Sequence, residues 1–191
     1  MANIEEKVEN LLSKTIEDLG YELYDVIYEK EAQDYYLRIF IDKPEGIDLN
    51  DCEKVNDAIS DMLDEANYIK DQYFLEVSSP GIERLLRKDK HLEANIGKEI
   101  DLKLYKPIDL ENEAITENKK EDNCKEENKK NEKAESKSKK ADKKKKVISK
   151  EVDGILQKFD ENAITIEIEN HQLLEVDRKN ISIIKLKYNW E

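Results

Sequence analysis

The chain is poor in the residue types that most often form catalytic centres and metal sites. Its 191 residues include two histidines, two cysteines, five glycines and one tryptophan. The glycines stand far apart in the sequence, so they form neither a phosphate-binding loop nor a dinucleotide-binding fingerprint. His91 and His171 are separated by 80 positions, and neither has a histidine partner at helical spacing. The common sequence patterns of zinc centres and nucleotide-binding enzymes are therefore excluded.

Long apolar runs and paired cysteines are also missing. No apolar run approaches the ~20 residues that cross a bilayer, and the first residues lack the basic-then-apolar order of a secretory signal. Cys52 is expected on the apolar face of a helix and Cys124 lies in a charged run, so we expect no disulfide between them. Two isolated thiols fit a reducing cytosol. These absences predict a cytoplasmic protein with no cofactor and no membrane contact.

Charge is what the sequence has in abundance. Charged residues make up 41% of the chain, and the net charge is −13. Glu117–Glu151 contains 14 lysines and 9 acidic residues, whereas the other 156 residues carry 19 basic and 37 acidic side chains. A fold this acidic repels phosphate backbones and attracts basic partners. The charge disfavours a general nucleic-acid binder and permits a basic protein as partner, although a role in solubility alone explains it equally well.

The sequence pattern of residues 1–83 predicts an α+β domain. Helical spacing and strand alternation of the apolar residues predict the following order. The elements are a helix at 4–19, strands at 21–28 and 35–41, a helix after Asp48 and a strand at 73–77. Asn3 and Asp48 are suitable N-caps, and Gly20 supplies a left-handed stop. This order predicts a three-stranded sheet with both helices on one face.

The sequence pattern of residues 91–191 predicts a second domain, which follows a linker at 84–90. Alternating apolar residues predict five short strands in about 60 folded residues, a pattern typical of a small closed β-barrel. Gly154 lies inside one of these strands, which predicts a bulge or a barrel corner. Residues 111–150 interrupt the pattern. They contain too few apolar side chains to offset the entropy of ordering, so we expect a disordered lysine- and glutamate-rich insertion.

The junction between the two domains is the most informative stretch. The strand at 73–77 leads into Ser78-Ser79-Pro80-Gly81, where proline cannot donate to a sheet and glycine accepts a positive φ angle, so the strand must end. Glu76 is an acid in a mainly apolar strand, and we expect it to face solvent or to pair with Arg84 or Arg87.

The run Leu75-Glu-Val-Ser-Ser-Pro-Gly81 closely resembles the signature that joins the two domains of the bacterial ribosome maturation factor RimP family. Matching residues extend the resemblance over 1–110 and 151–191. They are Gly20, Asp42, Asp51-Cys52, Ile96-Gly97-Lys98 and Gly154-Ile155-Leu156. The resemblance implies an α+β domain followed by a small barrel of the SH3 or Sm type. The chain departs from the family in its long insertion and in Arg84-Leu85-Leu86, where members commonly have Arg-Pro-Leu.

The resemblance also implies a function. Family members are non-enzymatic assembly factors of the small (30S) ribosomal subunit. They bind the immature subunit and promote incorporation of a basic ribosomal protein, the twelfth in bacterial numbering. It further implies a monomer with a possible rRNA contact. Two other classes stay open, namely an RNA-binding module that uses the barrel and Lys143–Lys146, and a hydrolase built on unrecognised carboxylates.

The junction supplies the candidate partner-binding residues, and no catalytic or metal-binding residue is predicted. Arg84, Arg87 and Lys88 form a basic cluster, and the planar fork of arginine suits carboxylate or phosphate recognition. An interdomain salt bridge explains the same residues equally well. The predicted partner-binding set is Ser78, Ser79, Pro80, Gly81, Arg84, Arg87 and Lys88.

Overall fold

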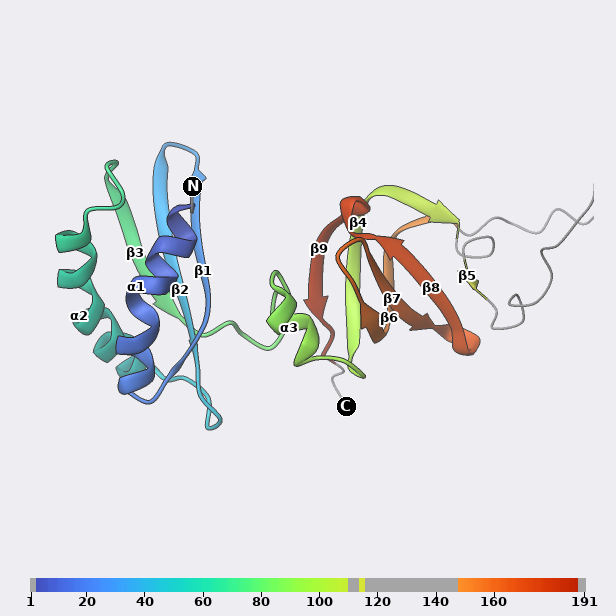
Figure 1. Cartoon of the computed structure of the whole chain (residues 1–191), viewed down its shortest axis with the longest axis horizontal. Helices are drawn as coiled ribbons and strands as arrows, with labels where there is room; N and C mark the ends of the chain where they lie inside the picture. The colour runs from blue at the N-terminus through green and yellow to red at the C-terminus, as the bar shows by residue number, and fades with distance from the viewer. Residues whose placement is uncertain (1–2, 110–113, 116–147, 189–191) are drawn as a thin grey trace, which may run out of the picture. The chain divides into compact units, whose positions relative to one another are not determined.

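The computed structural model describes residues 3–109, 114–115 and 148–188 (Figure 1). The chain divides into two compact units, Met1–Ile82 and Glu83–Glu191. The second unit begins at Glu83, so the segment 84–90 that the sequence suggests as a linker belongs to this unit. Each unit has its own apolar core.

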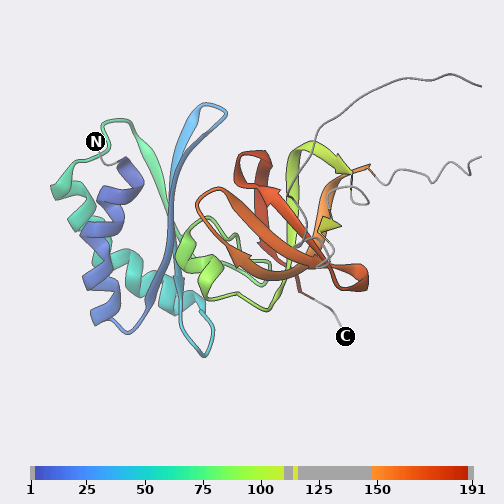
Figure 2. The same cartoon turned by 45° about the vertical axis from the view of Figure 1, so that its right-hand side comes forward.

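The first unit is a three-stranded sheet covered on one face by two helices (Figures 1 and 2). Its elements are α1 (Ile4–Asp18), β1 (Glu22–Glu31), β2 (Asp34–Asp42), α2 (Leu49–Ala66) and β3 (Tyr73–Ser78). Strand β2 lies in the centre, antiparallel to β1 and parallel to β3. The predicted α+β architecture, element order and placement of the helices are confirmed.

Side-chain caps explain where the two helices begin. The Asn3 side chain accepts a hydrogen bond of 2.8 Å from the Glu6 amide at the start of α1. Asp48 and Asp51 form a capping box at the start of α2, because each side-chain carboxylate accepts from the other residue's amide. Helix α2 ends at Asn67, whose φ of 47° is the left-handed conformation typical of a helix end.

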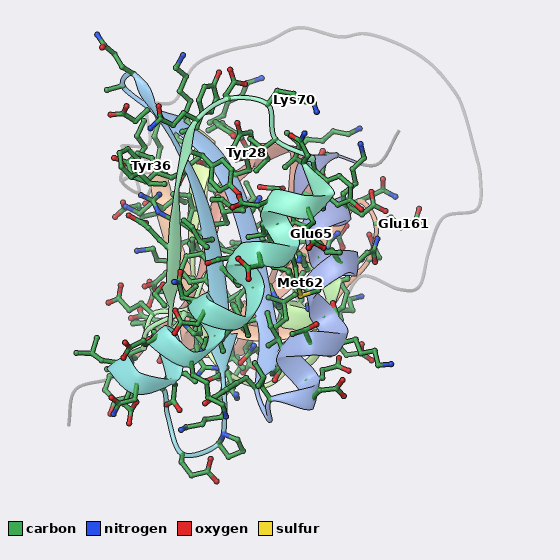
Figure 3. All side chains as sticks on the ribbon, turned by 90° about the vertical axis from the view of Figure 1, so that its left-hand side faces the viewer. Tyr28, Tyr36, Met62, Glu65, Lys70 and Glu161 are labelled. Atoms are coloured by element: carbon green, nitrogen blue, oxygen red, sulfur yellow. The ribbon has the colours of Figure 1, made fainter. Side chains whose placement is uncertain are left out.

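The core of the first unit lies between the sheet and the helices. Alternate residues of β2, namely Leu37, Ile39 and Ile41, are fully buried against both helices. Met62 extends from α2 toward α1, where the Thr15 hydroxyl lies 3.5 Å from its sulfur (Figure 3). Since the aliphatic residues of β2 all use one face, the opposite face of the sheet is left for polar and aromatic side chains.

The second unit is built around a six-stranded antiparallel sheet with the order β5-β8-β7-β6-β4-β9. Its elements are α3 (Asp89–Glu93), β4 (Glu99–Asp109), β5 (Ala114–Ile115), β6 (Ile148–Phe159), β7 (Ala163–Ile168), β8 (Gln172–Asp177) and β9 (Ile181–Leu186), with 3-10 turns at Glu169–His171 and Arg178–Asn180. The mixed α+β class is confirmed. Among the described residues no ladder joins β9 to β5, so the closed SH3- or Sm-like barrel stays a prediction.

The structure corrects the expected insertion at both ends. Ala114–Ile115 pairs with β8, and β6 already begins at Ile148, although both segments fall within the range 111–150 expected to be disordered. Composition alone wrongly predicted disorder at these positions, because pairing with neighbouring strands supplies hydrogen-bond partners to their backbone N–H and C=O groups. Residues 116–147 lie outside the described residues.

Gly154 permits close contact between two strands. A Cβ atom at this position would lie 2.6 Å from the Glu167 carbonyl oxygen of β7, a distance that real Cβ atoms do not adopt. The register shift between β6 and β7 comes slightly later, between Leu156 and Lys158. The glycine therefore serves the close approach of backbones, and the bulge expected at Gly154 lies beyond it.

Candidate functional site

The first part of the predicted partner-binding set lies at the end of β3. Ser78 is the last residue of the strand and pairs with Phe40 of β2. Ser79, Pro80 and Gly81 follow at the surface, half-buried or exposed. The φ angle of Gly81 is 75°, which confirms the positive φ expected from the sequence. No heavy atom lies within 4 Å of where its Cβ would be, so only the backbone angle requires glycine here.

The second part, Arg84, Arg87 and Lys88, lies in the second unit. The backbone beside it is held against β9, since the Leu86 amide donates to the Ile184 carbonyl at 2.9 Å and the Leu186 amide donates to the Arg84 carbonyl at 2.9 Å. The Leu86 side chain is buried in the core of this unit. Arg87 is exposed, and Arg84 and Lys88 are half-buried. The predicted set therefore divides between the two units.

Glu76 is exposed, which confirms the first of the two alternatives expected from the sequence. Its carboxylate accepts a hydrogen bond of 2.7 Å from Nε of Arg38, which stands directly opposite it on β2. Parallel pairing of β3 with β2 places this guanidinium on the same face of the sheet as Glu76. The other alternative, a pairing with Arg84 or Arg87 of the second unit, stays a prediction. The sequence could not show which arginine would be opposite Glu76, since this depends on the register between the two strands.

This pair belongs to a larger cluster on the sheet face opposite the helices, which sequence reasoning missed. Cross-strand partners share a face, so β1, β2 and β3 each contribute to it. We call this cluster the acidic–aromatic face and define it as Glu29, Glu31, Tyr36, Arg38, Phe74 and Glu76. The available signal was the alternation, along β2 and β3, of charged, polar or aromatic residues with the mostly aliphatic residues of the core face.

Arg38 lies at the centre of the acidic–aromatic face. Its Nη1 atom pairs with Glu29 and, at 2.7 Å, with Glu31, while Nε pairs with Glu76. The guanidinium carbon lies 5.0 Å from the centre of the Tyr36 ring, and Tyr36 in turn stacks on Phe74 with ring centres 5.4 Å apart. One arginine is thus shared by three carboxylates and stacked on an aromatic pair.

The charges of this cluster influence one another. The hydrogen bonds that Arg38 donates to Glu31 and Glu76 hold the pKa of Arg38 above its usual value, and the same bond to Glu31 lowers the pKa of that carboxylate. Three carboxylates around one guanidinium leave a net charge of −2 on the face. The arrangement can therefore accept a further cation near neutral pH.

A second polar cluster, around Asp51, has a structural role. Its carboxylate receives hydrogen bonds from the Asp48 amide at 2.8 Å, from the Tyr21 hydroxyl at 2.8 Å and from the Lys43 ammonium. These interactions lower the pKa of Asp51 to about 2, with the backbone hydrogen bond as the largest cause. The cluster joins the start of α2 to the ends of β1 and β2, and all its members have partners within the fold.

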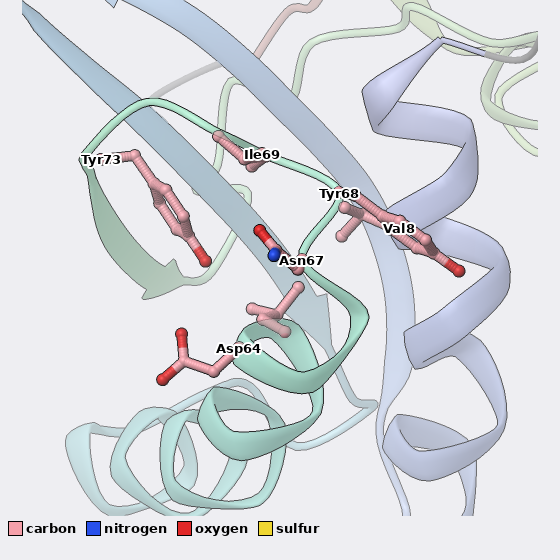
Figure 4. A pocket seen from close by; sticks show the side chains of 7 residues that line it. Val8, Asp64, Asn67, Tyr68, Ile69 and Tyr73 are labelled. Atoms are coloured by element: carbon pink, nitrogen blue, oxygen red, sulfur yellow. The ribbon is translucent and has the colours of Figure 1, made fainter.

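The hollow beside α1 is too small to hold a cofactor. A hollow of about 60 Å³ lies between α1 and the end of α2, lined by Val8, Leu63, Asp64, Asn67, Tyr68, Ile69 and Tyr73 (Figure 4). It is smaller than the ~300 Å³ at which ligand pockets usually begin. Within the described ranges, no group of three or more histidine, cysteine, aspartate or glutamate side chains is arranged to hold a metal ion.

The comparison with protein families can now be placed on this fold. Among the helices of the described part, none is long and apolar enough to cross a membrane. A family model described as the RimP N-terminal domain matches residues 11–83. This range runs from within α1 through β3 to the Ser78–Gly81 turn and ends at the boundary between the two units. Residues 11–83 of the chain therefore form a RimP N-terminal domain.

Proposed function

We propose that the chain is a non-enzymatic assembly factor that binds the immature small (30S) ribosomal subunit and a basic ribosomal protein. The observation that carries the proposal is the match of residues 11–83 to the N-terminal domain of a ribosome maturation factor family. The signature Leu75–Gly81, which carried the resemblance in the sequence, falls inside this match. The proposal includes a cytoplasmic monomer whose second unit closes into an SH3- or Sm-like barrel.

The distribution of charge supports a basic protein as the partner. The first unit, residues 1–82, contains 21 acidic and 7 basic side chains, for a net charge of −14. The second unit contains 25 acidic and 26 basic side chains, for a net charge of +1. The acidity of the chain therefore comes entirely from the first unit. Such a field accelerates encounter with basic proteins and opposes binding of RNA.

The seven residues named from the sequence remain the proposed contact set at the junction. Ser78 to Gly81 would present backbone groups, and Arg84, Arg87 and Lys88 would supply positive charge to rRNA phosphates or to acidic groups of the partner. Backbone hydrogen bonds to β9 hold the segment from Arg84 to Leu86, which favours a defined presentation of the basic side chains.

Sedimentation of a cell lysate through a sucrose gradient tests this function. We expect the protein to travel with free small subunits and their precursors, and to be absent from complete ribosomes. Depletion should cause small-subunit precursors to accumulate. The variant Arg84→Ala should keep its melting temperature and sediment less with the subunit. A protein that stays at the top of the gradient while depletion leaves the ribosome profile unchanged would disprove the proposal.

A further inference from the structure

The acidic–aromatic face exposes apolar carbon beside carboxylates. Phe74 is 53% exposed although it lies in a sheet and stacks on Tyr36. The side chains of Glu29, Glu31 and Glu76 are 45%, 52% and 45% exposed. An exposed aromatic pair bordered by ionised carboxylates is the surface that guanidinium groups recognise, because they stack on rings and pair with carboxylates at the same time.

Arg38 of this same face already makes contacts of this kind with the glutamates and with an aromatic ring. Arg38 donates a hydrogen bond to one carboxylate oxygen of each of the three glutamates, namely Glu29 Oε1, Glu31 Oε1 and Glu76 Oε2. Among the described residues the second oxygen of each glutamate has no partner. The outer side of Phe74 is likewise exposed. A guanidinium from outside can therefore repeat the contacts that Arg38 makes from within the sheet.

A hollow at one end of the face adds further acidic groups. Its volume is about 300 Å³, and it is lined by Gln33, Asp34, Tyr35, Asp71, Gln72 and Phe74. Phe74 therefore belongs both to the hollow and to the acidic–aromatic face. Asp34 and Asp71 are exposed and make no ion pair with another described residue. The end of a long basic side chain fits this space.

The two edges of the sheet differ in a way that favours access from β3. At the β1 edge, the Tyr28 amide donates to the Glu5 carboxylate at 3.1 Å, and the Val26 amide donates to Asp25 at 2.9 Å. Side chains thus cover this edge, as is common for strands that must not pair further. In the described part of the chain β3 has one neighbour, β2, so its other edge stays available beside Phe74.

We propose that the acidic–aromatic face and the adjoining hollow bind an extended, arginine-rich segment of a protein, which enters along β3. Arginine side chains of this segment stack on Phe74 and pair with Glu29, Glu31 and Glu76, and one basic side chain fills the hollow between Asp34 and Asp71. This inference rests on the proposed function and extends it, since it assigns the basic partner to a set of residues other than the junction set.

The test uses the full chain and a nona-arginine peptide as the probe. Titration calorimetry measures affinity, and amide chemical shifts show where the peptide binds. Three variants are compared with the wild type, and circular dichroism verifies that each is folded. Glu29→Gln/Glu31→Gln/Glu76→Gln removes the negative charges of the face and leaves the positive charge of Arg38, and Phe74→Ala removes the ring and keeps all four charges. The matched control, Glu53→Gln/Asp57→Asn/Glu65→Gln, removes three exposed charges from α2 on the other side of the sheet.

We expect the peptide to change amide chemical shifts on β2 and β3. Affinity should fall about tenfold in the triple glutamine variant and about fivefold in Phe74→Ala. The control should lose less than twofold. Equal losses in the control and the face variant would show that only the net charge attracts the peptide, and would overturn the inference. Tighter binding of a 20-nucleotide single-stranded RNA that competes with the peptide would overturn it as well.

Gradient sedimentation separates this inference from the function on which it rests. If the wild type and the face variant both travel with small subunits to the same extent, the assembly role stands and the acidic–aromatic face is not the contact surface. If the face variant no longer travels with small subunits and the α2 control still does, the proposed function and this inference are both supported. If the wild type itself does not travel with the subunit, the proposed function fails, whatever the peptide shows.

Discussion

At the scale of single residues, backbone geometry sets strict limits at a few positions. Gly81 has φ at 75° and Gly154 approaches a neighbouring strand, and these are two different reasons for glycine. The first is a conformational requirement, which asparagine can also meet. The second is a lack of space, which no side chain can meet. Substitutions at the two glycines should therefore follow different patterns.

At Gly81, Val should be destabilising and Asn should be tolerated. A β-branched residue at positive φ is strained by about 1–3 kcal/mol, whereas asparagine adopts this region readily. Asn67 already does so in this chain, with φ at 47°. Urea unfolding of Gly81→Val and Gly81→Asn measures the difference. Equal stability of the two variants would show that the turn rearranges to relieve the strain.

At Gly154, even alanine should be costly. Its Cβ would lie 2.6 Å from the Glu167 carbonyl oxygen, which forces the two strands apart. Overpacking of this kind costs about 1–3 kcal/mol. Urea unfolding of Gly154→Ala checks the expectation, with Ser182→Ala at an exposed position of β9 as the control. An unchanged midpoint would mean that β6 and β7 separate without loss of pairing.

Asp51 should give the fold a measurable dependence on acid. Its pKa is about 2 in the folded chain and 3.8 without the fold. The stabilisation it provides is therefore complete above the unfolded pKa and is lost as the pH falls from about 4 through about 2. Melting temperatures of the wild type and Asp51→Asn, measured from pH 7 to pH 2, should differ most at neutral pH and converge in acid. A constant difference across this range would contradict the assignment.

At the scale of elements, the strand boundaries around the insertion decide which deletion the fold tolerates. Ala114 and Ile115 pair with Leu174 and Leu173, and the first residues of β6 pair with the end of β4. A deletion that spares them leaves the ladders intact, whereas one that follows the composition of the sequence removes them.

Replacement of residues 116–147 by a four-residue glycine–serine loop should change the melting temperature by no more than ~2–3 °C, since loop closure depends weakly on length. Deletion of 111–150 should lower it further, because Ala114–Ile115 and the start of β6 are lost. Thermal denaturation followed by circular dichroism distinguishes the two. The expectation fails if the shorter deletion abolishes cooperative unfolding.

At the scale of the whole molecule, the net charge is concentrated in one unit. The first unit carries −14 and the second +1, so like-charge repulsion acts almost entirely within residues 1–82. Such repulsion opposes the compact state. The acidity that attracts a basic partner therefore has a cost in stability, which salt or the partner itself relieves.

Salt should accordingly stabilise the first unit more than the second. The Debye length falls from ~10 Å at 0.1 M to ~3 Å at 1 M, which screens the repulsion. A relief of about 1 kcal/mol corresponds to roughly 4–8 °C for a domain of this size. Calorimetry of the full chain at increasing sodium chloride should show one transition that moves upward and one that moves little. Two transitions that move together would show that net charge does not determine the stability of the first unit.

The sequence by itself determined the local structure and the order of elements. Helix caps at Asn3 and Asp48, the apolar periodicity of the first unit and the positive φ at Gly81 follow from interactions between neighbouring residues, so they were predictable. The Leu75–Gly81 signature pointed to the family that the match at 11–83 identifies. These features depend on short-range sterics and hydrogen bonding, which sequence patterns record directly.

Only the tertiary structure decided which residues meet across strands. The parallel register of β2 with β3 brings Glu76 to Arg38, and it stacks Phe74 on Tyr36. The short strand at 114–115 exists because β8 is there to pair with it. Contacts of this kind join residues that are distant in the chain, and a shift of one position in register would send every side chain to the other face, so strand patterns alone do not reveal the acidic–aromatic face.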